Sequence, residues 1–348
     1  MPGGGRWHGS GSIYGHEGVG RTAVRPYIRC MDGLVFMLTS LESGIGLQIV
    51  VWLQGHGSGF ADALATLFHY LGQTLFYIPI LALIYWSFDK KLGLRMLFAL
   101  VLMVVVVVVA KLAIQAPRPD AAFPDQVRSV VPQSGYGLPS GHVAVSLVVW
   151  GYAAYWLKRR WLWGLLAIYL PIMAWARMYA GVHYPQDVIG GLMLGAAALW
   201  LFIRTADPVE AAWFRLSVSE QVAIVLLSVV VTFGFLYTTD DGTAAAGALL
   251  GGGLGYILEM RRVKFTTAGS AATRLLRFVF GITLTLLLYF GLTVLFAGQE
   301  PHDVLRVIRY MLVTLFAVAL WPGWMGRLLR EATPDSPASL TPGTESDR

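Results

Sequence analysis

The chain has 348 residues, of which 56% are hydrophobic and 13% are charged, and its formal net charge is +6. Soluble domains average about 25% charged residues, so this composition excludes an ordinary soluble protein and predicts a polytopic membrane protein. The basic residues form no continuous face, which argues against a nucleic-acid partner. Cys30 is the single cysteine, which excludes an internal disulfide and a cysteine-based zinc cluster.

The apolar runs predict an all-α bundle with nine or ten transmembrane helices, because a span needs about 20 mostly apolar residues. Residues 1–30, rich in Gly and Arg, lack the apolar core of a signal peptide and are expected to form a disordered tail. Segment 34–53 is apolar but carries Glu42, so it either spans the membrane or lies flat in the interface. The other expected spans are 65–87, 92–113, 142–157, 161–178, 186–204, 219–238, 243–259, 275–296 and 305–325.

We expect the chain to divide near 205–218. Residues 31–205 would form the first membrane unit, 206–330 a four-helix extension, and 331–348 a second disordered tail. Within the extension, Gly247, Gly251 and Gly255 recur at a spacing of four. Such a stripe indicates close helix packing within the bundle or, alternatively, a homodimer interface.

The distribution of positive charge predicts the orientation in the membrane. Basic clusters at 90–95, 158–160 and 261–274 share one side of the expected spans. The positive-inside rule makes that side cytoplasmic. The opposite loops hold Arg118 and Arg128 as their only basic residues. The three polar motifs that follow are therefore expected to open on the extracytoplasmic face.

The first motif joins Lys111, at the end of an apolar run, to Arg118 within Pro117–Arg118–Pro119. A lysine in this place can simply extend its ammonium group toward the membrane interface. The two prolines, however, end the helix and restrict the backbone around Arg118. Such rigidity suits a guanidinium that grips phosphate with two parallel hydrogen bonds.

The second motif, Pro139–Ser140–Gly141–His142, stands at the start of the next apolar run. Ser140 is a suitable N-cap residue, and Gly141 allows main-chain N–H groups to approach a ligand. Free N–H groups and a partial positive charge at a helix N-terminus favour an anion. The same tetrapeptide also fits an ordinary capped helix with a surface histidine.

The third motif places Arg177 six residues before His183, and Asp187 four residues after it. If a helix begins near Tyr184 or Pro185, Asp187 faces back over the first turn and can reach His183. A carboxylate on one ring nitrogen selects the tautomer and leaves the other nitrogen free as a nucleophile. The alternative is a polar loop at the membrane edge with an acidic residue in the first helical turn.

Together the three motifs resemble the type 2 phosphatidic acid phosphatase superfamily. That family includes membrane lipid phosphate phosphatases, undecaprenyl-diphosphate phosphatases and, more distantly, vanadium haloperoxidases. The resemblance covers roughly residues 60–205 and departs from the usual pattern at Ala176, where the family usually has Ser. The residues that carry it are Lys111, Arg118, Pro119, Pro139, Ser140, Gly141, His142, Arg177, His183 and Asp187.

The resemblance implies a catalytic core of about six helices and a phosphohistidine mechanism that uses no cofactor and no metal. His183 would attack phosphorus, Asp187 would orient it, and His142 would act first as acid and then as base. The phosphate oxygens would be bound by Lys111, Arg118, Ser140, Gly141 and Arg177. The histidines outside the motifs have no matching partners and are expected to be structural; they include His56, His69 and His302.

The expected function is hydrolysis of lipid phosphate monoesters or diphosphates at the extracytoplasmic face of a bacterial inner membrane. Polyprenyl diphosphate is favoured over phosphatidate, because a diphosphate suits a strongly cationic site. A lipid phosphotransferase with the same intermediate remains an alternative, and a phosphate-binding transporter a less favoured one. A metal hydrolase built on His142, His183 and Asp187 is disfavoured, because neighbouring cations suit an anion.

Overall fold

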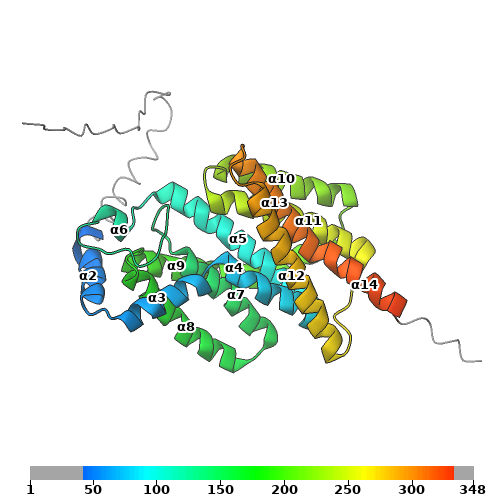
Figure 1. Cartoon of the computed structure of the whole chain (residues 1–348), viewed down its shortest axis with the longest axis horizontal. Coiled ribbons are helices and arrows are strands. Elements are labelled where there is room, and N and C mark those ends of the chain that lie inside the picture. The colour runs from blue at the N-terminus through cyan, green and yellow to red at the C-terminus, as the bar shows by residue number, and fades with distance from the viewer. Residues whose placement is uncertain (1–41, 333–348) are drawn as a thin grey trace, which may run out of the picture.

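The computed structural model describes residues 42–332, and every regular element in this range is helical. The all-α class predicted from the apolar runs is therefore confirmed. In Figure 1, α3, α6 and α8 lie toward one end of the molecule and α10–α14 toward the other, with α4 and α5 between them. The α-helices are α2 (Leu47–Gly55), α3 (Gly59–Leu71), α4 (Thr74–Leu83), α5 (Lys90–Ile114), α6 (Pro119–Ala122), α7 (Gly141–Leu157), α8 (Arg160–Tyr179), α9 (Pro185–Trp213), α10 (Val218–Leu236), α11 (Asp240–Leu258), α12 (Ala271–Leu295), α13 (His302–Leu315) and α14 (Trp321–Ala332). The π-helical turns are η1 (Glu42–Gly46), η2 (Ile84–Phe88), η3 (Glu259–Val263) and η4 (Phe316–Leu320).

Six helices of the described range are long and apolar enough to cross a membrane, or seven if one bent pair counts as a single span. These helices make the chain an integral membrane protein. They are α5, α8, α9, α10, α12 and the helix from α13 to Gly326. The predicted count of nine or ten spans is not confirmed. One reason is that α7 has only 17 residues, and another is that the Gly- and Ala-rich α11 is not among the six.

The predicted span 65–87 is divided between two helices, the bent pair that counts as one span in the higher number. α3 ends at Leu71, α4 begins at Thr74, and the two helices are bent by 57° relative to each other. A Cβ atom on Gly72 would lie 2.1 Å from Cδ2 of His142. The chain thus turns where its backbone packs directly against α7, a contact that the local apolar pattern does not encode.

The helix predicted over 186–204 continues to Trp213 as α9. Its added turns carry Asp207, which accepts a 2.6 Å hydrogen bond from Arg95 of α5, and Glu210, which pairs with both Arg95 and Lys91. These ion pairs hold the polar end of α9 against the start of α5. The predicted division at 205–218 therefore falls on a helix end, and residues 214–217 connect α9 to α10.

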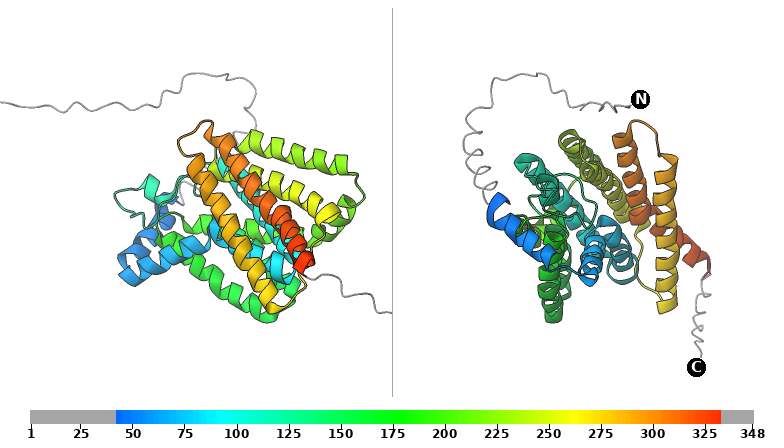
Figure 2. Two further views of the ribbon diagram at one scale, coloured as in Figure 1. Left: turned by 45° about the vertical axis from the view of Figure 1, so that its right-hand side comes forward. Right: turned by 60° about the vertical axis from the view of Figure 1, so that its left-hand side comes forward.

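The extension packs closely against itself and against α5, as Figure 2 shows from two further sides. Cβ atoms added at Gly247 and Gly251 would lie 2.4 Å and 2.1 Å from main-chain oxygens of α13, and one at Gly255 would meet Val318 at 3.0 Å. The glycine stripe thus lets α11 approach α13 within one chain. Because this face is buried, a homodimer would need another surface.

The outer faces of the helices are apolar. Leu227, Val230 and Phe235 on α10 and Leu287 and Val294 on α12 are exposed. A continuous apolar exterior of this kind suits contact with lipid. One buried core cluster lies between α4, α5, α7 and α9, where Met96 and Val149 are fully enclosed.

Several predictions concern residues outside the described range. They include the disordered tails 1–30 and 331–348, apart from the last two residues of α14, and positions 34–41 of the segment 34–53. The described remainder of that segment contains α2, which has nine residues and is too short to span a bilayer by itself.

Candidate functional site

The three motifs lie on five elements and meet at one end of the part of the bundle that α2 to α9 form. Lys111 occupies the last turn of α5 and Arg177 the last turn of α8. Arg118 precedes α6, Ser140 precedes α7, and Asp187 is in the first turn of α9. The side chains of the site therefore come from the ends of the apolar helices and from the loops that join them.

His183 and Asp187 form the pair that their spacing predicts. Asp187 Oδ2 lies 3.2 Å from His183 Nδ1 and accepts a 2.9 Å hydrogen bond from the Tyr184 main-chain N–H. Both side chains are buried. A carboxylate at Nδ1 places the ring proton there, so Nε2 carries the lone pair.

Arg118 faces that lone pair. Its Nη1 lies 3.2 Å from His183 Nε2 and donates at 2.8 Å to the carbonyl of Val182. Burial and the positive charges of Arg118 and Arg177 hold the pKa of His183 well below its usual range. The imidazole is therefore neutral at physiological pH, which is the state that a nucleophile requires.

The two arginines of the motifs are buried, and within the described part of the chain neither forms an ion pair or a hydrogen bond with a carboxylate. Arg118 is 2% exposed and donates to the carbonyls of Gly135, Ser134 and Val182. Arg177 is fully enclosed, and its side-chain hydrogen bonds within the described residues go to the neutral side chains of His69 and Gln133. Buried charges are usually paired, because an uncompensated charge in a low dielectric is costly. Two such guanidinium groups side by side indicate a site for an anion.

Lys111 belongs to the same cluster. Its ammonium is close enough to Arg118, Arg177 and Asp187 to interact with all three electrostatically. Among residues 42–332 it has no hydrogen bond or ion pair. The site thus concentrates positive charge around the His183–Asp187 pair.

The start of α7 differs in one respect from the sequence-based expectation. Ser140 is the N-cap residue by position, but its side chain makes no capping hydrogen bond. Its buried Oγ has no hydrogen-bond partner in the range 42–332, while its main-chain N–H donates at 2.9 Å to the carbonyl of Asp187. The Ser140 hydroxyl is therefore available to a ligand at the helix N-terminus. The missing Cβ of Gly141 would lie 3.2 Å from Val107, so this glycine also lets α7 approach α5.

His69 is the site residue that the motifs did not reveal. We expected it to be structural, without matching partners, but the structure places it between two motif residues. Its Nδ1 lies 2.9 Å from Nη1 of Arg177, and its carbonyl lies 3.1 Å from Nε2 of His142. The rings of His69 and His142 stack at 5.5 Å with an interplanar angle of 17°. Arg177 follows His69 by 108 residues, so no local spacing could have signalled this contact.

The other histidines outside the motifs remain apart from the site. His56 is exposed and bonds the Trp52 carbonyl one turn earlier in the chain. His302 is exposed and pairs with Glu300 at 2.8 Å. A surface hollow of about 450 Å³ lies beside Arg118 and is lined by the loop that contains Ser134 and Gly135.

Two family matches account for most of the described range. The PAP2 superfamily matches residues 92–209, and the transmembrane extension of PAP2 superfamily phosphatases matches residues 243–332. The chain belongs to the PAP2 superfamily. The first PAP2 match contains all three motifs, and the second contains most of α11 and all of α12 to α14.

Individual PAP2 relatives resemble only part of the chain. Sphingosine-1-phosphate phosphatase 2 of Mus musculus is 28% identical over 39% of this chain and 42% of its own length. Undecaprenyl-diphosphatase of Sulfolobus acidocaldarius is 29% identical over 38% of this chain and 65% of its own length. The chain thus spans less than two thirds of either relative. The crystal structure of Aquifex aeolicus LpxE aligns with a TM-score of 0.42 and 23% identity, over 46% of this chain and 96% of that one.

Proposed function

We propose that the protein is a membrane phosphatase that hydrolyses lipid phosphate monoesters or diphosphates through a phosphohistidine at His183. The observation that carries this proposal is a pair of buried arginines with neutral partners, set beside a His–Asp pair. The arginines supply an anion site and His183 supplies a nucleophile. Membership in the PAP2 superfamily and the phosphatase names of its relatives support the same reaction class.

In the first step, His183 Nε2 forms a bond to phosphorus as the bond to the leaving oxygen breaks. His142 gives its proton to that oxygen. In the second step, water attacks phosphorus, the nitrogen–phosphorus bond breaks, and His142 takes the proton from water. Phosphoryl transfer spreads charge over three equatorial oxygens, so positioning and fixed positive charge provide most of the catalysis.

The oxygen-binding groups follow from the same geometry. Lys111, Arg118 and Arg177 surround the His183–Asp187 pair, and the Ser140 hydroxyl and Gly141 amide stand at the N-terminus of α7. On binding, the arginines would exchange neutral partners for phosphate oxygens. Charge-assisted hydrogen bonds of this type are about twice as strong as neutral ones.

His69 acts in this proposal as a positioning residue. Its Nδ1 accepts a hydrogen bond from Arg177, which requires the neutral Nε2–H tautomer, and the Gln73 side-chain amide then presents its oxygen to that N–H. Its carbonyl accepts from His142 Nε2, which leaves His142 Nδ1 to exchange a proton with the leaving oxygen. The last turn of α3 thereby orients both Arg177, which binds the phosphate, and His142, which transfers the proton.

The substrate class is a lipid whose phosphate lies at the extracytoplasmic face. The site is at the helix ends opposite the basic cluster of Lys90, Lys91 and Arg95, and the positive-inside rule supports this orientation. The relatives include a sphingosine-1-phosphate phosphatase and an undecaprenyl-diphosphatase. We favour a polyprenyl diphosphate in a bacterial inner membrane, because a diphosphate matches three cations better than a monoester does.

Phosphate release by purified protein in detergent and EDTA tests the proposal. The substrates are a polyprenyl diphosphate and phosphatidate, and the variants are His183→Ala and the surface control His56→Ala. We expect release by the wild type and His56→Ala, none by His183→Ala, and covalently trapped phosphate only where His183 is present. Release that survives His183→Ala, or that appears only when a divalent metal is added, would contradict the mechanism. Phosphate found on an added acceptor lipid would instead identify a transferase.

A further inference from the structure

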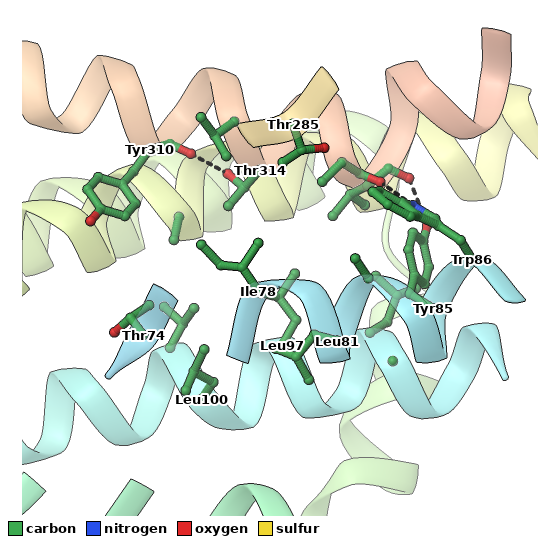
Figure 3. A pocket seen from close by; sticks show the side chains of 18 residues that line it. Thr74, Ile78, Leu81, Tyr85, Trp86, Leu97, Leu100, Thr285, Tyr310 and Thr314 are labelled. Atoms are coloured by element: carbon green, nitrogen blue, oxygen red, sulfur yellow. Dashed lines mark hydrogen bonds between the residues drawn. The ribbon is translucent and has the colours of Figure 1, made fainter. Parts of the chain in front are cut away.

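A second cavity lies between the two parts of the chain. It has a volume of about 100 Å³ and is bounded by α4, η2 and α5 on one side and by α11, α12, α13 and η4 on the other. Figure 3 shows Ile78, Leu97 and Leu100 facing Thr285 and Thr314 across it. The cavity therefore exists only because the extension packs against the first unit.

The lining of this cavity offers almost no polar group to a ligand. The hydroxyls of Thr285, Thr314 and Tyr85 and the indole N–H of Trp86 all donate to main-chain carbonyls, at 2.7–2.9 Å. Dashed lines in Figure 3 mark three of these bonds. With their polar atoms engaged, these side chains present methyl groups and ring faces. Such a wall suits a hydrocarbon ligand, because a polar ligand would lose its hydrogen bonds on entry.

The two ends of the cavity differ. Trp86 is fully enclosed and closes one end, whereas Thr74 at the other end is exposed. Thr74 directly follows Gln73, whose side chain lies 2.8 Å from His69 Nε2. His69 in turn contacts Arg177. Thr74, at the open end of the cavity, is therefore next in sequence to Gln73, which contacts the phosphate-binding cluster through His69 and Arg177.

Helix α5 connects the two sites along a single face. The residues 11, 14 and 18 positions before Lys111 are Leu100, Leu97 and Gly93. At 3.6 residues per turn, these spacings place all four residues on one stripe of the helix. The cavity-lining residue Leu100 lies about 16 Å along the axis from Lys111, at about 1.5 Å per residue. The cavity thus begins within the reach of a long hydrocarbon tail whose phosphate is held at Lys111.

We propose that this cavity binds the hydrocarbon tail of the lipid whose phosphate group is held at Lys111, Arg118 and Arg177. The inference rests on the proposed function and assigns a task to the extension, whose helices α11 to α13 form the second wall of the tail site. Since the cavity begins beyond the first part of the tail, long tails reach it and short tails do not. The tail site therefore selects for long-chain lipids.

The test compares two substrates with one head group, dioleoyl phosphatidate and the short-chain dibutyryl phosphatidate. Ala248→Phe fills the cavity from α11, and Leu97→Trp fills it from α5 in case the first variant does not fold. Leu227→Phe, on the exposed face of α10, is the matched control. Folding of each variant is checked by its thermal transition in detergent.

We expect each filled variant to lower kcat/KM for the dioleoyl substrate about tenfold or more, because binding of the remote tail contributes to the transition state. Turnover of the dibutyryl substrate should change less than about twofold, and Leu227→Phe should leave both substrates unchanged. Equal losses for the two substrates, or no loss for either, would overturn the tail site while wild-type activity upholds the phosphatase. A wild type that cleaves neither substrate nor a polyprenyl diphosphate would instead overturn the proposed function, and the tail site with it.

Discussion

Replacing His69 with alanine removes the hydrogen-bond acceptor that orients Arg177. In the native protein, the Arg177 guanidinium donates to His69 Nδ1 at 2.9 Å and to Gln133 Oε1 at 3.0 Å. The substitution leaves one of these two anchors. It also removes the ring that stacks on His142 at 5.5 Å. Arg177 and His142 would then sample orientations in which they do not meet the phosphate.

The size of the loss follows from the hydrogen bond. A hydrogen bond to a charged group contributes about 1.5–3 kcal/mol. At about 1.36 kcal/mol for each factor of ten in rate, His69→Ala should lower kcat/KM about 10- to 150-fold. His69→Gln keeps an acceptor oxygen within reach of Arg177, so it should recover part of this loss.

Steady-state phosphate release provides the assay, with kcat and KM determined separately for each variant. His56→Ala is the matched control, because His56 is exposed and bonds only to its own helix turn. Thermal transitions show whether each variant is folded. A folded His69→Ala protein with kcat/KM within about twofold of wild type would refute the positioning role, since loss of a charged hydrogen bond predicts more.

Three further predictions concern His183, Asp187 and Gly251. Asp187→Asn should lower kcat about 10²- to 10⁴-fold, because the carboxylate selects the His183 tautomer, and an unchanged rate would exclude that role. Burial, followed by the charges of Arg118 and Arg177, lowers the pKa of His183 in the folded protein, so the unfolded chain binds the proton more readily. The contribution of His183 to the free energy of unfolding is therefore fully present above about pH 6.5 and is lost as the pH decreases below it. The thermal transition temperature of His183→Gln should accordingly fall less steeply with decreasing pH than that of the wild type. Gly251→Ala should destabilise the fold by about 1–3 kcal/mol, because its Cβ would lie 2.1 Å from the Met311 carbonyl oxygen, whereas Gly291→Ala, with open space around it, should not.

Much of the fold could be predicted from the sequence, because an apolar run that is long enough to cross a membrane mainly forms a helix in lipid. Every backbone polar group must be satisfied internally there, which favours helices. The helices α5, α8, α10 and α12 accordingly lie close to their predicted ranges. The spacing of Gly247 and Gly251, which let α13 pack closely, is also recognisable in the sequence. The sequence does not show that α13 is the helix that packs against them.

The motifs carry local chemistry that the sequence displays directly. His183 and Asp187 are four residues apart, so a helix start between them brings their side chains together whatever the rest of the fold does. The prolines around Arg118 and the glycine after Ser140 likewise act on their immediate neighbours. The relative positions of residues that are this close in the sequence can be predicted without the tertiary structure.

Other features depend on contacts between distant segments, and only the tertiary structure decided them. The break at Gly72 lies where the His142 side chain of α7 packs against the backbone, and an apolar run gives no sign of this contact. His69 joins the site through a residue 108 positions away, and the apolar cavity forms where α4 and α5 meet the extension. Hydrophobicity and periodicity determine which segments become helices, but the packing of side chains at specific distances determines which helices meet and what lies between them.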